Sequence, residues 1–164
     1  TLRSGALLLA VALGIGSVAA WAEESETLKF DKSFPLPADG VDVIQVKAKV
    51  GSLVVDDIRL NNLPNEQEVK IAVANDTDDK CRPKIAVLFS NPTAVKMKAK
   101  VVATFESADG TVLFSCDRKD RIKPFADGDR TDVCFGFGAL TSMQLRHWPK
   151  VKKVHIVADI SRDN

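Results

Sequence analysis

The residues in this sequence with the most obvious chemistry are its three cysteines, Cys81, Cys116 and Cys134. The first residues of the chain predict export, and an exported chain meets an oxidising compartment where one disulfide and one remaining thiol are the expected state. Cys116 and Cys134 are the closest pair in the sequence, and a bond between them would join two adjacent strands. Cys81 is then free or an alternative partner, so three pairings are possible.

The alternation of side chains along the two strands argues partly against that pair. Cys116 shares one face of its strand with Phe114, whereas Val133 and Phe135 lie on the face opposite Cys134. If both apolar sets point inward, the two thiols lie on opposite faces unless a bulge intervenes, because successive side chains of a strand point to opposite sides. We therefore treat Cys116 and Cys134 as disulfide candidates and leave the pairing open.

Groups for acid–base and metal chemistry are scarce. The chain has no tyrosine and two histidines, His147 and His155, on different predicted elements. Zinc is disfavoured because the cysteines have no C-x-x-C spacing, and serine catalysis has no G-x-S-x-G turn to support it. A cysteine nucleophile needs a neighbouring base, and nothing in the sequence indicates one. We expect no catalytic residue, no metal and no cofactor, and hence a protein that is not an enzyme.

Two predicted turns contain aspartates whose oxygens suit calcium. The six residues are Asp76, Asp78 and Asp79 in one turn and Asp127, Asp129 and Asp132 in the other. Neither turn matches an EF-hand, and the second has Gly138 at the closing position where a glutamate is needed. Acidic residues of turns more often solvate and cap the backbone, so calcium is the less favoured interpretation.

The segment LRHWPK, residues 145–150, is the best candidate for a contact patch. Arg and Trp are favoured anchors at protein interfaces, and loops are where a rigid scaffold places its contacts. The interaction patch that we expect comprises Arg146, His147, Trp148 and Lys150. The alternative is that Trp148 packs into the core while Arg146 and Lys150 are solvated.

The elements that would position these residues alternate apolar and polar side chains with a period of two, which is typical of β-strands. The clearest run is AVKMKAKVVATFES, residues 94–107, with Lys96, Lys98 and Lys100 on one side. Alternating lysines are typical of a solvated sheet face and discourage aggregation at sheet edges. An anion-binding strip is the less favoured alternative for these lysines.

Further strands are predicted along the rest of the chain. They fall within residues 41–50, 53–55, 69–73, 85–89, 111–117, 130–137 and 151–160, and residues 121–125 are a weaker candidate. Residues 56–68 are predicted as a long loop and residues 126–129 as a turn. Residues 138–150 are less regular, with room for a helical turn before Pro149.

Two stretches of the sequence resemble bacterial immunoglobulin-like modules, often called FxLYD domains. The matching pieces are VLFSNPTAVKMKAKVVATFESADGTVLFS and IKPFADGDRTDVCFGF, and the likeness spans Lys84 to Phe137, about a third of the chain. The sequence departs from the family where its Leu-Tyr-Asp core would lie, since residues 105–109 contain no tyrosine. The resemblance implies an immunoglobulin-like sandwich with a binding or architectural role and carries over no catalytic residue.

Together these patterns predict an all-β protein, an immunoglobulin-like antiparallel β-sandwich of about seven or eight strands. We expect residues 41–164 to form this domain. Residues 23–40 contain two prolines and many charges and are predicted as an extended lead-in closed by a turn at residues 38–40. We expect no long helix after residue 22.

Residues 1–22 have the pattern of a secretory signal peptide. Arg3 is followed by an apolar run from Gly5 to Ala20, and Ala20-Trp21-Ala22 places small residues at a cleavage site before Glu23. The run is at the lower edge of the length that spans a bilayer, roughly 17–25 residues. An uncleaved anchor and a helix retained in a filament are the alternatives. The expected location is the periplasm or the exterior.

The charge balance limits the possible partners. The chain has 23 Lys and Arg against 22 Asp and Glu, and removal of residues 1–22 removes only Arg3 among them. A neutral surface does not favour nucleic acid, which needs a basic face. We expect an exported, non-catalytic module that mediates protein–protein interaction in the bacterial envelope, with an unidentified envelope protein as partner and no membrane span after cleavage. The alternatives are an inhibitor or ligand-binding protein of the periplasm, or a structural filament subunit that retains its N-terminal helix.

Overall fold

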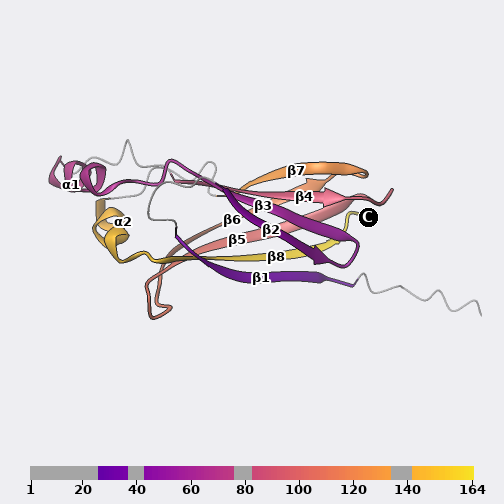
Figure 1. Ribbon diagram of the computed structural model, residues 1–164, viewed down its shortest axis with the longest axis horizontal. Helices are drawn as coiled ribbons and strands as arrows, with labels where there is room; N and C mark the ends of the chain where they lie inside the picture. Colours follow the sequence, from indigo (N-terminus) through magenta and orange to yellow (C-terminus); the bar gives the residue numbers. More distant parts are fainter. Residues whose placement is uncertain (1–25, 37–42, 76–82, 134–141) are drawn as a thin grey trace, which may run out of the picture.

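The computed structural model describes residues 26–36, 43–75, 83–133 and 142–164. These residues form eight strands in two antiparallel sheets of four, packed as a sandwich with two helices at one end (Figure 1). Sheet A has the order β1 (Leu28–Pro35), β8 (Lys153–Arg162), β5 (Met97–Glu106), β6 (Val112–Ile122). Sheet B has the order β2 (Val43–Val50), β3 (Leu53–Asn61), β4 (Lys84–Asn91), β7 (Ala126–Val133). The predicted antiparallel β-sandwich is confirmed.

Strict alternation of side chains places the core between the sheets. In β5, Val101, Ala103 and Phe105 are buried, while Lys98 and Lys100 are exposed. The predicted last strand behaves in the same way, since Val154 and its alternate neighbours in β8 are fully buried. Burial of the apolar side chains on the inner face of each strand therefore holds the two sheets together.

The strand β1 lies within the segment predicted as an extended lead-in. It pairs with β8 along its whole length, from Leu28 opposite Ile160 to Pro35 opposite Lys153. Phe30 is buried in the core. Residues from Leu28 onward are thus an integral strand of sheet A.

The predicted loop at residues 56–68 and the predicted strand at residues 69–73 are wrong. The strand β3 continues to Asn61, and a helix, α1 (Glu66–Asn75), follows. A reciprocal cap begins this helix: the Glu68 N–H donates to Asn65 Oδ1 and the Asn65 N–H donates to Glu68 Oε2, both at 2.9 Å. Val69 and Ala72 are buried whereas Ile71 is 49% exposed, so the apolar spacing is that of a helix.

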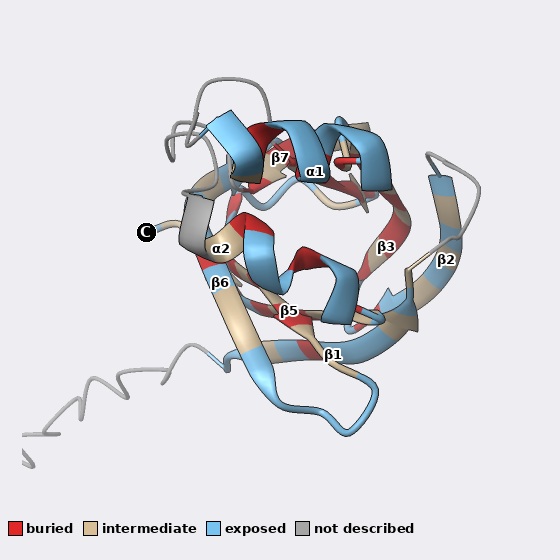
Figure 2. Ribbon diagram, turned by 90° about the vertical axis from the view of Figure 1, so that its left-hand side faces the viewer, coloured by how far each residue is buried: buried red, intermediate tan, exposed pale blue. Residues whose placement is uncertain are grey.

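The segment after β7 contains α2 (Ser142–His147) and a 3₁₀ turn, η1 (Trp148–Lys150), where a helical turn was expected. Together α1, α2 and η1 lie across one end of the sandwich, which Figure 2 shows from that end. We call this the helical end. Among the residues that the structure describes, no helix has the length and apolar character needed to cross a bilayer.

The predicted turn at residues 126–129 is also wrong, because Ala126 already belongs to β7. The chain instead reverses over residues 123–125, where Phe125 has a positive φ of 51°. This turn carries the chain from β6 in sheet A to β7 in sheet B and lies at the end away from the helices (Figure 1).

Candidate functional site

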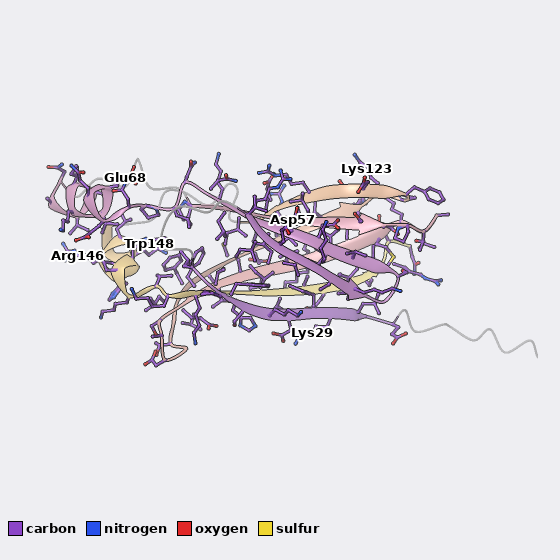
Figure 3. All side chains as sticks on the ribbon, in the orientation of Figure 1. Lys29, Asp57, Glu68, Lys123, Arg146 and Trp148 are labelled. Carbon is purple, nitrogen blue, oxygen red and sulfur yellow. The ribbon has the colours of Figure 1, made fainter. Side chains whose placement is uncertain are left out.

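The predicted interaction patch lies at the helical end, but its members have different environments. Trp148 is only 8% exposed, and its ring lies 5.6 Å from that of Phe105 and 5.8 Å from that of Phe114, measured between centroids. Arg146, His147 and Lys150 are exposed. Figure 3 shows Arg146 and Trp148 on this end of the molecule. Trp148 therefore fastens η1 to the sandwich, as in the alternative interpretation, and the charged residues face solvent.

Next to Trp148 the surface forms a hollow of about 540 Å³, which we call the helical-end hollow. Its apolar lining comes from the end of β1, the β3–α1 connection, α1 and η1, and consists of Leu36, Leu63, Pro64, Val69, Trp148, Pro149 and Val151. Asn65, Glu66 and Lys152 add polar groups. The backbone is held there by hydrogen bonds from Leu36 N to Lys152 O and from Lys152 N to Glu106 O, both 2.8 Å.

A smaller hollow of about 340 Å³ lies between α1 and α2. It is lined by Val69, Lys70, Val73, Ala74 and Arg146. Val69 contributes to both hollows, so the two are adjacent on the same end of the molecule. Sequence reasoning missed both, because they depend on α1, which was predicted as a loop and a strand.

A basic segment of the chain adjoins the helical-end hollow. Its cations are Arg146, Lys150, Lys152 and Lys153, of which Lys152 lines this hollow and Arg146 the smaller one, and no Asp or Glu occurs in the sequence between Asp132 and Asp159. In the described part of the chain, none of these four forms an ion pair. The acids of α1 on the other wall are engaged: Glu66 Oε1 lies 2.7 Å from Lys70 Nζ, whose hydrogen bond lowers the pKa of Glu66, and Glu68 caps the helix. We call the four cations the basic rim.

The second histidine belongs to a separate cluster on the outer face of sheet A. His155 Nε2 lies 2.6 Å from Asp31 Oδ1, and its Nδ1 lies 3.2 Å from Glu106 Oε1. Lys29 Nζ is 3.1 Å from Asp31 Oδ2, and the hydrogen bonds from His155 and Lys29 lower the pKa of Asp31. The cluster links β1, β8 and β5. It joins a histidine to two acids, but both hollows described above are lined by other residues, so it supports strand positions better than catalysis.

A third polar cluster crosses sheet B. Asp56 accepts hydrogen bonds from Lys47 Nζ at 3.0 Å and from Ser90 Oγ, and Ser90 Oγ accepts one from Gly128 N at 3.2 Å. These four residues lie at bulges or irregular positions of β2, β3, β4 and β7. The hydrogen bond to Asp56 raises the pKa of Lys47. The carboxylate thus connects all four strands where their ladders are interrupted.

The aspartates considered for calcium have other partners. Asp129 accepts from Lys123 N at 2.8 Å, Asp132 accepts from Arg130 Nε at 2.6 Å, and Asp127 lies 3.4 Å from Ser90 Oγ. Within the described residues, no group of three His, Cys, Asp or Glu side chains is arranged to hold a metal ion. Asp76, Asp78 and Asp79 lie outside the described residues.

Cys116 is buried in β6, opposite Ala103 of β5. Cys81 and Cys134 lie outside the described residues, so the pairing of the cysteines stays a prediction. The strand of Cys116, β6, is at the edge of sheet A, and β7, which ends at Val133, is at the edge of sheet B.

Comparison of the chain with protein-family models and with curated proteins found no match. The resemblance to FxLYD domains therefore depends on the quoted residues alone. Any function has to be argued from the surfaces described above.

Proposed function

We propose that this chain is an exported, non-catalytic module of the bacterial envelope that binds another protein through its helical end. The observation that carries the proposal is the helical-end hollow, an apolar depression of about 540 Å³ beside a basic rim. Concave, mainly apolar sites with a few placed polar groups are typical of binding sites. Export is supported by residues 1–22 and remains the prediction of the sequence.

The edge strands support binding less well than the hollow does. Addition of a partner strand needs a regular, uncharged edge. The edge strand β2 is interrupted by a bulge and exposes Lys47 and Lys49, and β6 exposes a charged run from Asp117 to Lys119. These features protect β2 and β6, two of the four edge strands, against pairing. The apolar hollow leads us to place the contact at the helical end.

The chemistry of the hollow indicates the kind of segment that it binds. Leu36, Leu63 and Val69 offer an apolar floor, and Lys150 and Lys152 on the rim face solvent. An apolar side chain of the partner would occupy the hollow while neighbouring acidic side chains meet the basic rim. We therefore propose an acidic protein segment with an apolar anchor as the ligand.

A small apolar ligand is the second candidate, because the volume of the hollow lies within the range of small-molecule sites, about 300–1,000 Å³. Such a ligand would use the floor and make little use of the rim. The two candidates therefore differ in how they respond to a change of charge on the rim.

The test places a photo-crosslinking amino acid at Leu63, which lines the hollow, and at Lys49 as a matched exposed position on β2. We expect irradiation of envelope preparations to join one defined protein to the Leu63 variant and not to the Lys49 variant. Adding Arg146→Glu and Lys150→Glu should lower the yield of that product on the order of 10-fold, while Lys49→Glu should leave it unchanged.

Equal crosslinking from both positions, or none from Leu63, would overturn the proposal. A Leu63 variant that retains a small molecule in native mass spectrometry, with binding that is insensitive to the rim substitutions, would support the second candidate instead.

A further inference from the structure

The outer face of sheet A carries four cations in two directly opposed pairs. Lys98 of β5 lies opposite Arg121 of β6, and Lys100 lies opposite Lys119. Neighbouring positions on one face of a strand are roughly 7 Å apart, and neighbouring strands about 5 Å apart. Like charges directly opposite each other destabilise a sheet. We call these four residues the cation block.

Three acids lie beside the cation block, and one of them, Asp117, shares the outer face of β6 with Lys119 and Arg121. Asp163 lies 2.9 Å from Arg121 Nε and 3.3 Å from Lys96 Nζ, so it is shared between two cations. Asp159 of β8 lies opposite Lys100, and also opposite Lys29 of β1. Among the described residues, no ion pair involves Lys98, Lys100 or Lys119. These three lysines are exposed and open to an anionic partner.

An exposed aromatic ring stands at the end of this block. The chain continues from Arg121 and Ile122 into the turn at residues 123–125, where the Phe125 side chain is 72% exposed. Phe125 also has a positive φ of 51°, a backbone conformation that non-glycine residues adopt at a cost. Both the exposure and the conformation are unfavourable for folding.

A hydrogen-bonded network holds this turn in place. The buried Asn91 donates from Nδ2 to Val95 O at 2.8 Å and to Lys123 O at 3.0 Å, and its Oδ1 accepts from Thr93 N at 3.1 Å. Phe125 N donates to Thr93 O at 3.0 Å. Val95, in the neighbouring loop, is a second exposed apolar residue. A strained conformation that its surroundings enforce is typical of functional positions.

From the cation block and the Phe125 turn we infer a docking site for the surface of an anionic lipid bilayer. Lys98, Lys100 and Lys119 would meet phosphate groups of the lipids, and the Phe125 ring would enter the boundary between headgroups and acyl chains. A soluble polyanion would account for the cations but offers nothing to an exposed apolar ring. The ring is exposed on the turn between β6 and β7, at one end of the sandwich, where a bilayer can reach it.

The docking site lies at the end of the sandwich that is farthest from the helices. The strand β1 begins, and β8 ends, at this same end (Figure 1). Lys123 lies toward that end, whereas Arg146 and Glu68 mark the opposite one (Figure 3). The site is thus distinct from the helical-end hollow, and a molecule docked through it would present the helical end away from the lipid.

The test uses the full chain and vesicles of phosphatidylglycerol with brominated acyl chains, which quench tryptophan on contact. Phe125→Trp places a reporter at the turn. Val112→Trp is the matched control, because Val112 is 59% exposed at the other end of β6. The fluorescence of the unchanged chain, which contains Trp21 and Trp148, is subtracted. In the Phe125→Trp variant, we expect the vesicles to quench at least about half of the fluorescence that the new tryptophan adds. In the Val112→Trp variant, the added fluorescence should be retained.

The charge requirement is tested on the Phe125→Trp chain. Replacing Lys98, Lys100 and Lys119 with serine should abolish the quenching, as should vesicles of phosphatidylcholine alone. Replacing Lys49, Lys150 and Lys152 with serine removes the same charge elsewhere and should leave it intact. Equal quenching at positions 112 and 125, or quenching that survives the loss of the cation block, would overturn the inference. If the triple variant does not fold, the comparison of the two reporters and of the two lipids still decides.

Discussion

Phe125 is the residue at which the local rules of folding are most clearly broken. Its side chain gains little from burial, and its backbone has a positive φ of 51°. Asparagine tolerates this conformation better than an aromatic residue does. We expect Phe125→Asn to raise the free energy of unfolding by about 1 kcal/mol, because it relieves the strain and removes no buried contact.

Urea denaturation of the two proteins measures this difference. Phe125→Ala is the control, because alanine keeps the strain and should change stability little. A Phe125→Asn protein that is less stable than the unchanged chain would mean that the ring packs against the fold, contrary to its exposure.

Asp109 predicts a pH dependence at the turn between β5 and β6. Hydrogen bonds from Ser107 Oγ and Thr111 N lower the pKa of this carboxyl from 3.8 to about 2. Because the pKa is depressed in the folded state, ionised Asp109 stabilises the turn above pH 3.8, and this contribution is lost as the pH falls through about 2. We expect Asp109→Asn to lower the Tm at neutral pH and to have no effect at the acid end of that range.

Measuring the Tm of the unchanged chain and of Asp109→Asn from neutral pH down to about pH 2 tests the direction of this effect. Glu68→Gln, at the cap of α1, controls for a general effect of removing one carboxylate, since no hydrogen bond connects it to this turn. If the difference in Tm between the unchanged chain and Asp109→Asn grows as the pH falls, Asp109 does not stabilise the turn in its ionised form.

At the scale of elements, α1 matters most, since it forms a wall of both hollows. Asn65→Ala removes the acceptor for the Glu68 N–H and should lower stability by about 1 kcal/mol. Asn65 lines the helical-end hollow directly before the first turn of α1, and its loss would disturb this wall of the hollow. We therefore expect crosslinking from position 63 to fall as well. Denaturation gives the first value and the crosslinking yield the second. Asn75→Ala, at the exposed last position of α1, is the matched control and should change neither.

The strands were easiest to predict where one face is buried and the other solvated. In β5 and β8 the alternation is unbroken, and the sequence predicts both correctly. The helix α1 was missed because Val69, Ile71 and Val73 are compatible with a period of two, whereas the deciding residues are Ala72 and the Asn65–Glu68 cap. The available signal was an asparagine followed three residues later by a glutamate, which is the spacing of a capping box.

The candidate sites could be predicted only in part for a related reason. The sequence shows that Lys98 and Lys100 share a face, but not that Lys119 and Arg121 lie opposite them, because the register between strands is a tertiary property. The same holds for the contacts of His155 with Asp31 and Glu106, which come from three strands. Arg146 and Trp148 were identified by residue type, while the burial of Trp148 required the positions of Phe105 and Phe114.

At the scale of the whole molecule, processing of the N-terminus is the first quantity to measure. We expect the intact mass of the protein from its native envelope to correspond to a chain that starts at Glu23. Alkylation under denaturing, non-reducing conditions should add one group, because one disulfide leaves one of three cysteines to react. A mass that retains residues 1–22 would contradict cleavage and favour an anchored or filament-forming subunit.

The pairing of β1 with β8 has a mechanical consequence. Leu28 lies opposite Ile160, so the first and last strands of the described fold are neighbours whose outer ends lie side by side. A pull on the two ends of the chain in opposite directions would load the hydrogen bonds between β1 and β8 one pair at a time, as in a zip, rather than all together in shear. Tension would therefore peel β1 from sheet A first and at low force, because β1 is bonded on one side only, whereas β8 is also held by β5.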